Sequence, residues 1–139
     1  YEFEQDCLDV SHSLKRMIAL MMTSLCVKHF VNAEKPLTGE ELSRQLEIPI
    51  RLCRSVLSEL TEARLLSEVC LDDRNAIAYQ PACDTRHLTV AGVIERLDQQ
   101  GTTAIPIVEN ADVRKLRETL QRYHESNLQS SANVRLQDL

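Results

Sequence analysis

The chain has few of the residues that loop-rich and phosphate-binding folds require. Its 139 residues include three glycines, four prolines and no tryptophan, and aromatic residues make up 4%. A many-stranded β-sandwich needs more turn residues than this, and a phosphate-binding loop needs clustered glycines. The composition therefore favours helices in one globular domain. At this length, a single hydrophobic core stabilises a chain without disulfides or metals.

Basic residues are in the minority. The sequence has 16 lysines and arginines against 21 aspartates and glutamates, which gives a formal net charge of -5 and a pI near 5.4. Domains that hold nucleic acid mainly through its phosphates are usually basic. The charge therefore argues against a nucleic-acid partner, and we do not expect one.

The sequence has no arrangement that is typical of a metal or catalytic site. It lacks CxxC and HExxH motifs, and its four histidines are scattered over different predicted elements. The five cysteines are odd in number and several fall in apolar patterns, so we interpret them as reduced thiols in a cytosolic environment. Cys70 and Cys83 can approach each other across a hairpin, but reduced thiols are favoured there too. We assign no catalytic residue, no metal ligand and no cofactor.

Hydrophobic periodicity predicts the helices. Apolar residues at spacings of three and four indicate one long helix over residues 11–32 and two shorter helices over residues 39–46 and 49–63. Thr38 and Glu41 have the spacing of a capping box, and Pro49 suits the first turn of the third helix. Thr89 can cap a further helix that ends before Gly101, and a last helix is predicted over residues 111–124.

The two short helices are followed by a strand, turn, strand pattern, LLSEVCL-DDRN-AIAYQP. This order predicts a winged helix-turn-helix, mainly α with a small β-wing, with added N-terminal and C-terminal helices. We expect residues 1–101 to form the winged-helix domain, with its long N-terminal helix. Residues 102–125 are expected to form a linker and a C-terminal amphipathic helix, and residues 126–139 a disordered tail.

Two sets of residues are candidates for binding. Arg51 and Arg54, at the start of the second short helix, would be the nucleic-acid contacts if that helix entered a major groove. However, residues 36–66 carry four arginines against five glutamates, and the wing tip has two aspartates, so we interpret this surface as facing protein.

The last helix has a narrow apolar stripe that can cover the first helix of its own chain or pair with a second copy. The stripe consists of Val113, Leu116, Leu120 and Tyr123.

Residues 1–101 resemble the cytosolic C-terminal extension of bacterial YihY/BrkB-type membrane proteins, a family labelled ribonuclease BN. The resemblance depends on YEFEQD, EKPLTGEELSRQLEIPIRLCRSVLSEL, LLSEV and AYQPACDTRHLTVAGVIERLD. It implies a membrane-helix domain of the same parent protein before Tyr1, as the partner of this domain, and a position on the cytoplasmic side of the inner membrane. The ribonuclease label implies tRNA processing, but we find no catalytic constellation in this chain and expect no enzyme.

The winged-helix portion is also similar to the iron-sulfur regulators typified by IscR, in which an LTV helix start follows the wing, here at residues 88–90. Those regulators carry closely spaced cysteines in this region, where this chain has Cys83 alone, so the resemblance implies no bound cluster. Our leading hypothesis is a non-enzymatic interaction or regulatory domain of an inner-membrane protein, with a possible homodimer through the terminal helices. The alternative is a winged-helix DNA-binding transcription regulator.

Overall fold

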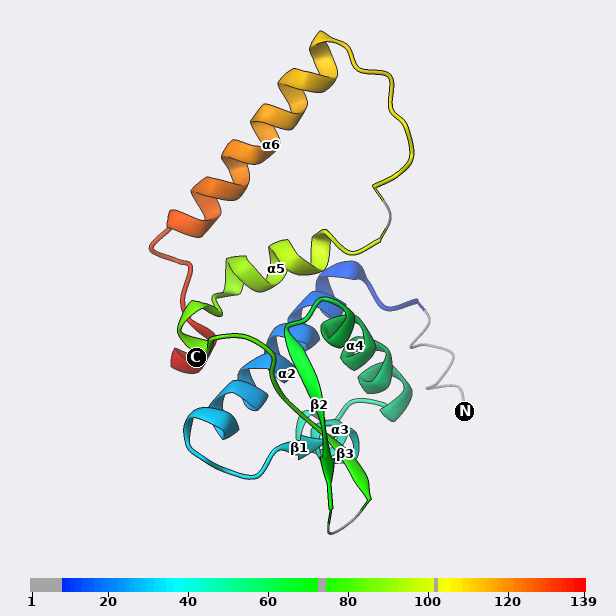
Figure 1. The fold of residues 1–139 in the computed structure, drawn as a ribbon, viewed down its shortest axis with the longest axis vertical. Helices are drawn as coiled ribbons and strands as arrows, with labels where there is room; N and C mark the ends of the chain where they lie inside the picture. The colour runs from blue at the N-terminus through cyan, green and yellow to red at the C-terminus, as the bar shows by residue number, and fades with distance from the viewer. Residues whose placement is uncertain (1–8, 73–74, 102) are drawn as a thin grey trace.

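The computed structural model describes residues 9–72, 75–101 and 103–139 as helices around one small antiparallel sheet (Figure 1). In chain order, the elements are α2 (His12–Val31), β1 (Leu37–Thr38), α3 (Gly39–Leu46), α4 (Ile50–Glu62), β2 (Leu66–Leu71), β3 (Ala76–Pro81), the 3-10 turn η2 (Thr85–His87), α5 (Val90–Asp98), α6 (Ala111–Gln129) and the 3-10 turn η3 (Leu136–Asp138). This order confirms the predicted winged helix-turn-helix with added terminal helices. Helices α3 and α4 form the helix-turn-helix, and the β2–β3 hairpin is the wing.

The helix starts follow the capping signals in the sequence. The hydroxyl of Thr38 accepts a hydrogen bond from the backbone N–H of Glu41, and the Glu41 carboxylate accepts one from the backbone N–H of Thr38, so the predicted capping box is present. Pro49 occupies the N-cap of α4, and the Thr89 side chain caps α5. Each of these three helices therefore begins within one residue of its predicted start.

The sheet is small and has the strand order β1-β3-β2. Strand β3 lies in the middle, with Leu37 opposite Tyr79 on one side and Val69 opposite Ala78 on the other. Ala78 is buried, because this strand turns one face toward the helices. The wing tip was predicted as a turn over residues 72–75, and residues 73 and 74 lie outside the described part of the chain.

The core forms between α2, α4 and the base of the sheet. Helix α4 turns its apolar face into this core. The buried residues of that face are Leu52, Cys53, Val56, Leu57 and Leu60. Five buried side chains on one helix of 13 residues make it a central element, since each contributes about 1.5–3 kcal/mol of burial free energy.

Helix α2 is apolar on two faces. Ile18, Met22 and Cys26 are buried against α4 and the sheet, whereas Met17 and Met21 are 56% and 43% exposed. Of the three methionines of this helix, only Met22 is therefore a core residue. No helix in the described residues is both long enough and apolar enough to cross a lipid bilayer.

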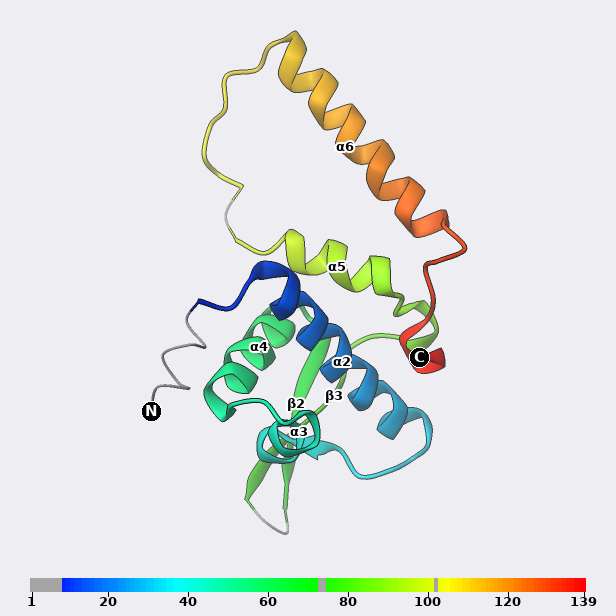
Figure 2. The same cartoon turned by 180° about the vertical axis from the view of Figure 1, so that it is seen from behind.

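The end of the chain does not form the predicted disordered tail. Helix α6 continues to Gln129, and the backbone then returns to the start of α5 (Figures 1 and 2). There, Val90 N–H donates to the carbonyl of Val134, and Leu136 N–H donates to the carbonyl of Leu88 at 2.9 Å. The prediction failed because the segment has no periodicity: one side chain, Leu136, enters the core, and backbone pairing supplies the remaining contacts.

Polar side chains strengthen the return of the C-terminal segment. Asn133 accepts a hydrogen bond from the backbone N–H of Ala91 at 2.8 Å and donates to the hydroxyl of Thr89 at 3.2 Å. The hydroxyl of Ser24 in α2 donates to the carbonyl of Leu136 at 3.1 Å. These bonds connect the residues after α6 to both α2 and α5, so the C-terminal end of α6 is fixed to the domain.

Two of the four described cysteines are core residues. Cys26 and Cys53 are buried, whereas Cys70 and Cys83 are exposed, and all four are free thiols. Burial, with a smaller contribution from the neighbouring Cys53, raises the pKa of Cys26 from 9.0 to about 12. Burial likewise raises the pKa of Cys53 to about 11. Both core thiols therefore stay protonated and unreactive at neutral pH.

Leu136→Ala is expected to destabilise the domain by about 2–5 kcal/mol, because the substitution leaves a cavity at a fully buried side chain. Leu139→Ala is the matched control, since Leu139 is 54% exposed, and should change stability by less than about 0.5 kcal/mol. Urea denaturation followed by circular dichroism measures both. Equal, small changes in the two variants would show that the C-terminal segment is not part of the core.

Alkylation should separate the two classes of cysteine. We expect iodoacetamide to modify Cys70 and Cys83 in the folded protein at neutral pH and to modify Cys26 and Cys53 only after unfolding. Since burial raises the folded-state pKa of Cys26, its contribution to stability is fully present below pH 9 and is lost as the pH rises toward about 12. Peptide mass spectrometry identifies the modified residues, and rapid labelling of Cys26 in the native state would contradict this account.

Candidate nucleic-acid interface

The exposed face of α4 carries hydrogen-bond donors over residues 51–58. Arg51 and Arg54, the two predicted contacts, are both exposed and lie one turn apart, so the structure brings them to one face. Ser55 and Ser58 are exposed on the same face, at spacings of four and seven residues from Arg51. Glu62 follows at the C-terminal end of the helix. Residues 51–58 of α4 therefore present two guanidinium groups and two hydroxyls to solvent.

The core side of α4 fixes this exposed face. Because Val56, Leu57 and Leu60 are buried, the helix cannot rotate without exposing them. The first turn of α4 contains no acidic residue. In helix-turn-helix proteins, the N-terminal residues of the second helix contact base edges, and this is the part of α4 that is rich in donors.

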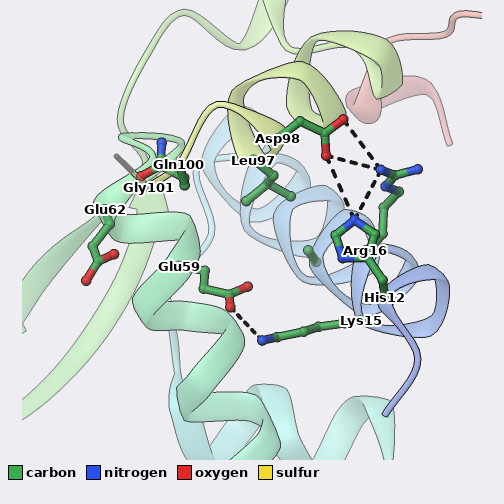
Figure 3. Close-up of a pocket in the computed structure, with 10 residues that line it drawn as sticks. His12, Lys15, Arg16, Glu59, Glu62, Leu97, Asp98, Gln100 and Gly101 are labelled. Carbon is green, nitrogen blue, oxygen red and sulfur yellow. Dashed lines mark hydrogen bonds and ion pairs between the residues drawn. The ribbon is translucent and has the colours of Figure 1, made fainter. Parts of the chain in front are cut away.

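The glutamates that were counted against nucleic-acid binding do not all share this surface. Glu41 is half-buried in the capping box of α3. Glu59 lies at the edge of the exposed face and turns toward α2, where Lys15 Nζ lies 2.5 Å from its carboxylate (Figure 3). A count along the sequence therefore overstated the negative charge of the exposed face of α4, because folding directs these two carboxylates elsewhere.

A charged pocket joins α2, α4 and α5 at the end of α4 remote from its donors. It has a volume of about 340 Å³, and Figure 3 shows Lys15 pointing to Glu59 and Arg16 pointing to Asp98. Arg16 Nη2 lies 3.1 Å from Asp98 Oδ1. These pairs connect adjacent residues of α2 to two different helices. These two ion pairs thus hold α4 and α5 against α2, and we assign the pocket this structural role.

A second ion pair lies on the helix-turn-helix itself. Arg54 Nη2 is 3.3 Å from Glu40 Oε1, and both side chains are exposed to solvent. A backbone hydrogen bond, followed by the guanidinium of Arg54 and the charge of Arg44, holds the pKa of Glu40 below its usual range. Glu40 is therefore ionised at neutral pH, beside two of the arginines of the helix-turn-helix.

The wing adds no positive charge in its described part. Residues 66–72 and 75–81 contain no lysine or arginine, and Glu68 and Asp72 are exposed. Contacts with a phosphate backbone would therefore come from α3 and α4 rather than from these wing residues. The predicted repulsion of phosphates by the wing tip stays a prediction for residue 73, which lies outside the described residues.

The stripe on α6 does not cover the first helix of its own chain. Leu116, Leu120 and Tyr123 are 62%, 66% and 67% exposed, and Val113 is half-buried. Figures 1 and 2 show α5 lying between α6 and α2. Helix α2 has an apolar groove of about 500 Å³ of its own. Its lining residues include Met17, Leu20, Met21, Leu25, Leu46 and Leu139.

Several residues of this site were not identified from the sequence. Ser55 and Ser58 could have been found, because they continue the spacing of Arg51 around the helix. The contact between Glu40 and Arg54 joins two helices across 14 residues, and no local pattern predicts it. Within residues 9–72, 75–101 and 103–139, no group of three or more histidine, cysteine or acidic side chains is placed to hold a metal ion.

Comparisons with known proteins identify the fold. No protein-family model matches the chain, and a search of curated proteins finds no match. Among solved structures, IscR of T. potens matches with a TM-score of 0.54 at 15% identity, over 84% of this chain and 77% of that chain. A Listeria innocua protein assigned as a transcriptional regulator matches with a TM-score of 0.55 at 14% identity, over 83% and 77%. CymR, the global cysteine regulator of B. subtilis, matches with a TM-score of 0.50 at 18% identity, over 84% and 84%.

These similarities correct two expectations. We did not expect nucleic acid as a partner, and we expected a membrane-helix domain. Both expectations are wrong, because the solved structures that match this chain include transcription regulators. The ribonuclease label also finds no support, since these regulators are not enzymes. The location at the inner membrane stays a prediction. At 14–18% identity the similarity establishes the fold, and the chain is a winged-helix protein built on the same plan as these regulators.

Proposed function

We propose that this chain is a winged-helix transcription regulator that binds duplex DNA through α4. The observation that carries this proposal is the exposed face of α4, on which Arg51, Arg54, Ser55 and Ser58 stand together while the apolar face is buried. An α-helix fits the major groove, where arginine can bond both acceptors of a guanine edge. Serine hydroxyls can donate to phosphate oxygens or to bases.

The overall negative charge of the chain affects which interactions could contribute to DNA binding. With a net charge of -5, long-range attraction to DNA is weak, so non-specific affinity is expected to be low. Binding then depends on a few short-range contacts of α3 and α4. In a regulator of this kind, base contacts contribute more binding free energy than a broad cationic surface does. Its affinity for DNA should therefore fall only moderately as the salt concentration rises.

The regulator is proposed to act without an iron-sulfur cluster. The region between the wing and the end of α5 contains one cysteine, Cys83, whose Sγ lies 3.5 Å from Arg96 Nη1. A cluster requires several ligands that converge on one point, and a single thiol does not supply them. Any control of DNA binding would therefore use other residues.

Pairing of two copies through the terminal helices completes the proposal. The stripe on α6 and the groove on α2 are both apolar and exposed, and α5 separates them within one chain. A second copy can bring its α6 to the free α2 and offer its own α2 in return, which is the reciprocal contact of a two-fold dimer. A dimer would present two α4 helices to half-sites about 34–36 Å apart.

Arg51→Ala and Arg54→Ala are expected to weaken specific DNA binding by about 1–3 kcal/mol each, because each substitution removes a donor from the groove-facing surface. A preferred duplex is first selected from a random pool, and mobility-shift titrations then give affinities at about 50 mM and 200 mM salt. Arg122→Ala on α6 removes the same charge away from α4 and serves as the control. The proposal fails if the wild-type chain selects no sequence, or if all three variants lose affinity equally.

Leu120→Asp is expected to convert the dimer into monomers with little loss of stability, since it places a charge on an exposed position of the apolar stripe. Gln121→Asp introduces the same charge at the next residue, off the stripe, and should leave the dimer intact. Sedimentation velocity measures the oligomeric state of each variant. A wild-type chain that stays monomeric at high concentration would contradict pairing through these helices.

A further inference from the structure

The guanidinium that the proposed interface would direct toward DNA is already held by a carboxylate. Arg54 Nη2 donates to Glu40 Oε1 at 3.3 Å, and the side chains are 65% and 63% exposed. Glu40 lies in the first turn of α3, and Arg54 lies in the second turn of α4. The pair therefore bridges the two helices of the helix-turn-helix on its solvent side.

Glu40 faces positive charge from two helices. Arg44 follows it by one turn on α3, and the charges of Arg44 and Arg54 both favour the ionised carboxylate. A phosphate group bound between α3 and α4 would meet the same two guanidinium groups. The carboxylate of Glu40 thus occupies the position at Arg54 that a phosphate oxygen of DNA would take.

We propose that Glu40 is an intramolecular competitor of DNA that limits the affinity of DNA for the surface at Arg54. This inference rests on the proposed function and deepens it. DNA binding requires Arg54 to exchange the carboxylate for a phosphate or a guanine edge, and an exposed ion pair is weak enough for that exchange. DNA that brings no phosphate or guanine edge within reach of Arg54 would leave the ion pair with Glu40 intact.

The exchange has a measurable effect on salt dependence. When Arg54 leaves Glu40, the carboxylate recovers a solvent cation, and this uptake offsets the counterion that DNA releases at the new contact. In E40Q there is no carboxylate to recover a cation. Log affinity should therefore fall more steeply with log salt in E40Q, by a slope difference of up to about one.

The experiment uses the full chain and a fluorescein-labelled duplex, both in mixed sequence and in the sequence that the chain selects. Affinities are measured by anisotropy across a salt series for the wild type, E40Q, R54A and the E40Q/R54A double variant. E47Q is the matched control, because Glu47 is exposed in the turn between α3 and α4 and its replacement removes the same charge. Circular dichroism confirms that each variant is folded.

We expect E40Q to bind the selected sequence about fivefold more tightly than the wild type, with an equal or smaller gain on mixed-sequence DNA, where Arg54 is engaged less often. E47Q should gain less, and E40Q should gain nothing in the R54A background, because the released guanidinium is then missing. If the E40Q substitution raises DNA affinity only when Arg54 is present, the two residues are coupled as the exchange at Arg54 requires.

Four results would overturn the inference. Equal gains in E40Q and E47Q would show a general effect of net charge, and a gain that persists with R54A would show that Arg54 is not involved. Wild-type binding without any gain in E40Q would remove this inference and leave the proposed function standing. Absence of binding by both the wild type and E40Q at low salt would remove the proposed function and this inference together.

Discussion

Burial of the apolar face of α4 is the constraint on which the rest of the structure depends. Val56, Leu57 and Leu60 pack into the core between α2 and the sheet, and they fix the rotation of the helix about its axis. That rotation decides which charges reach the surface. It places Arg51 and Arg54 in solvent and turns Glu59 toward Lys15 on α2. The candidate interface is thus a consequence of hydrophobic packing.

A second constraint positions the C-terminal helix. Leu136 enters the core, and residues 88–90 pair with residues 134–136, so α6 is anchored at its far end as well as through α5. Helix α6 has no buried residue of its own. A helix with an exposed apolar stripe that is anchored at its C-terminal end is partly ordered before a partner binds, which is why pairing of two copies is the favoured explanation.

The sequence predicts the fold well, because periodicity and capping are local signals. The pair Thr38 and Glu41, the proline at residue 49 and the alternation over residues 66–81 determine the helix-turn-helix and the wing without tertiary information. The ordered C-terminal segment could not be predicted in this way. Its order depends on one leucine and on backbone hydrogen bonds to residues some 45 positions earlier, and neither leaves a periodic pattern.

The candidate site was only partly predictable. Arg51 and Arg54 were identified from their place at the start of a predicted recognition helix, but the interpretation of the surface as acidic was misleading. A count of charges along a sequence treats all side chains as exposed, whereas the fold directs Glu41 and Glu59 away from the donor face of α4. The contact of Glu40 with Arg54 is tertiary and required coordinates.

The most direct test of the central claim is a titration of the isotope-labelled chain with its selected duplex, followed by amide chemical shifts in NMR spectra. If the buried face of α4 orients a DNA-binding surface, the largest shifts will fall on residues 40–58, with small shifts on α6. Shifts confined to α6, or no shifts at a saturating concentration of duplex, would contradict the account.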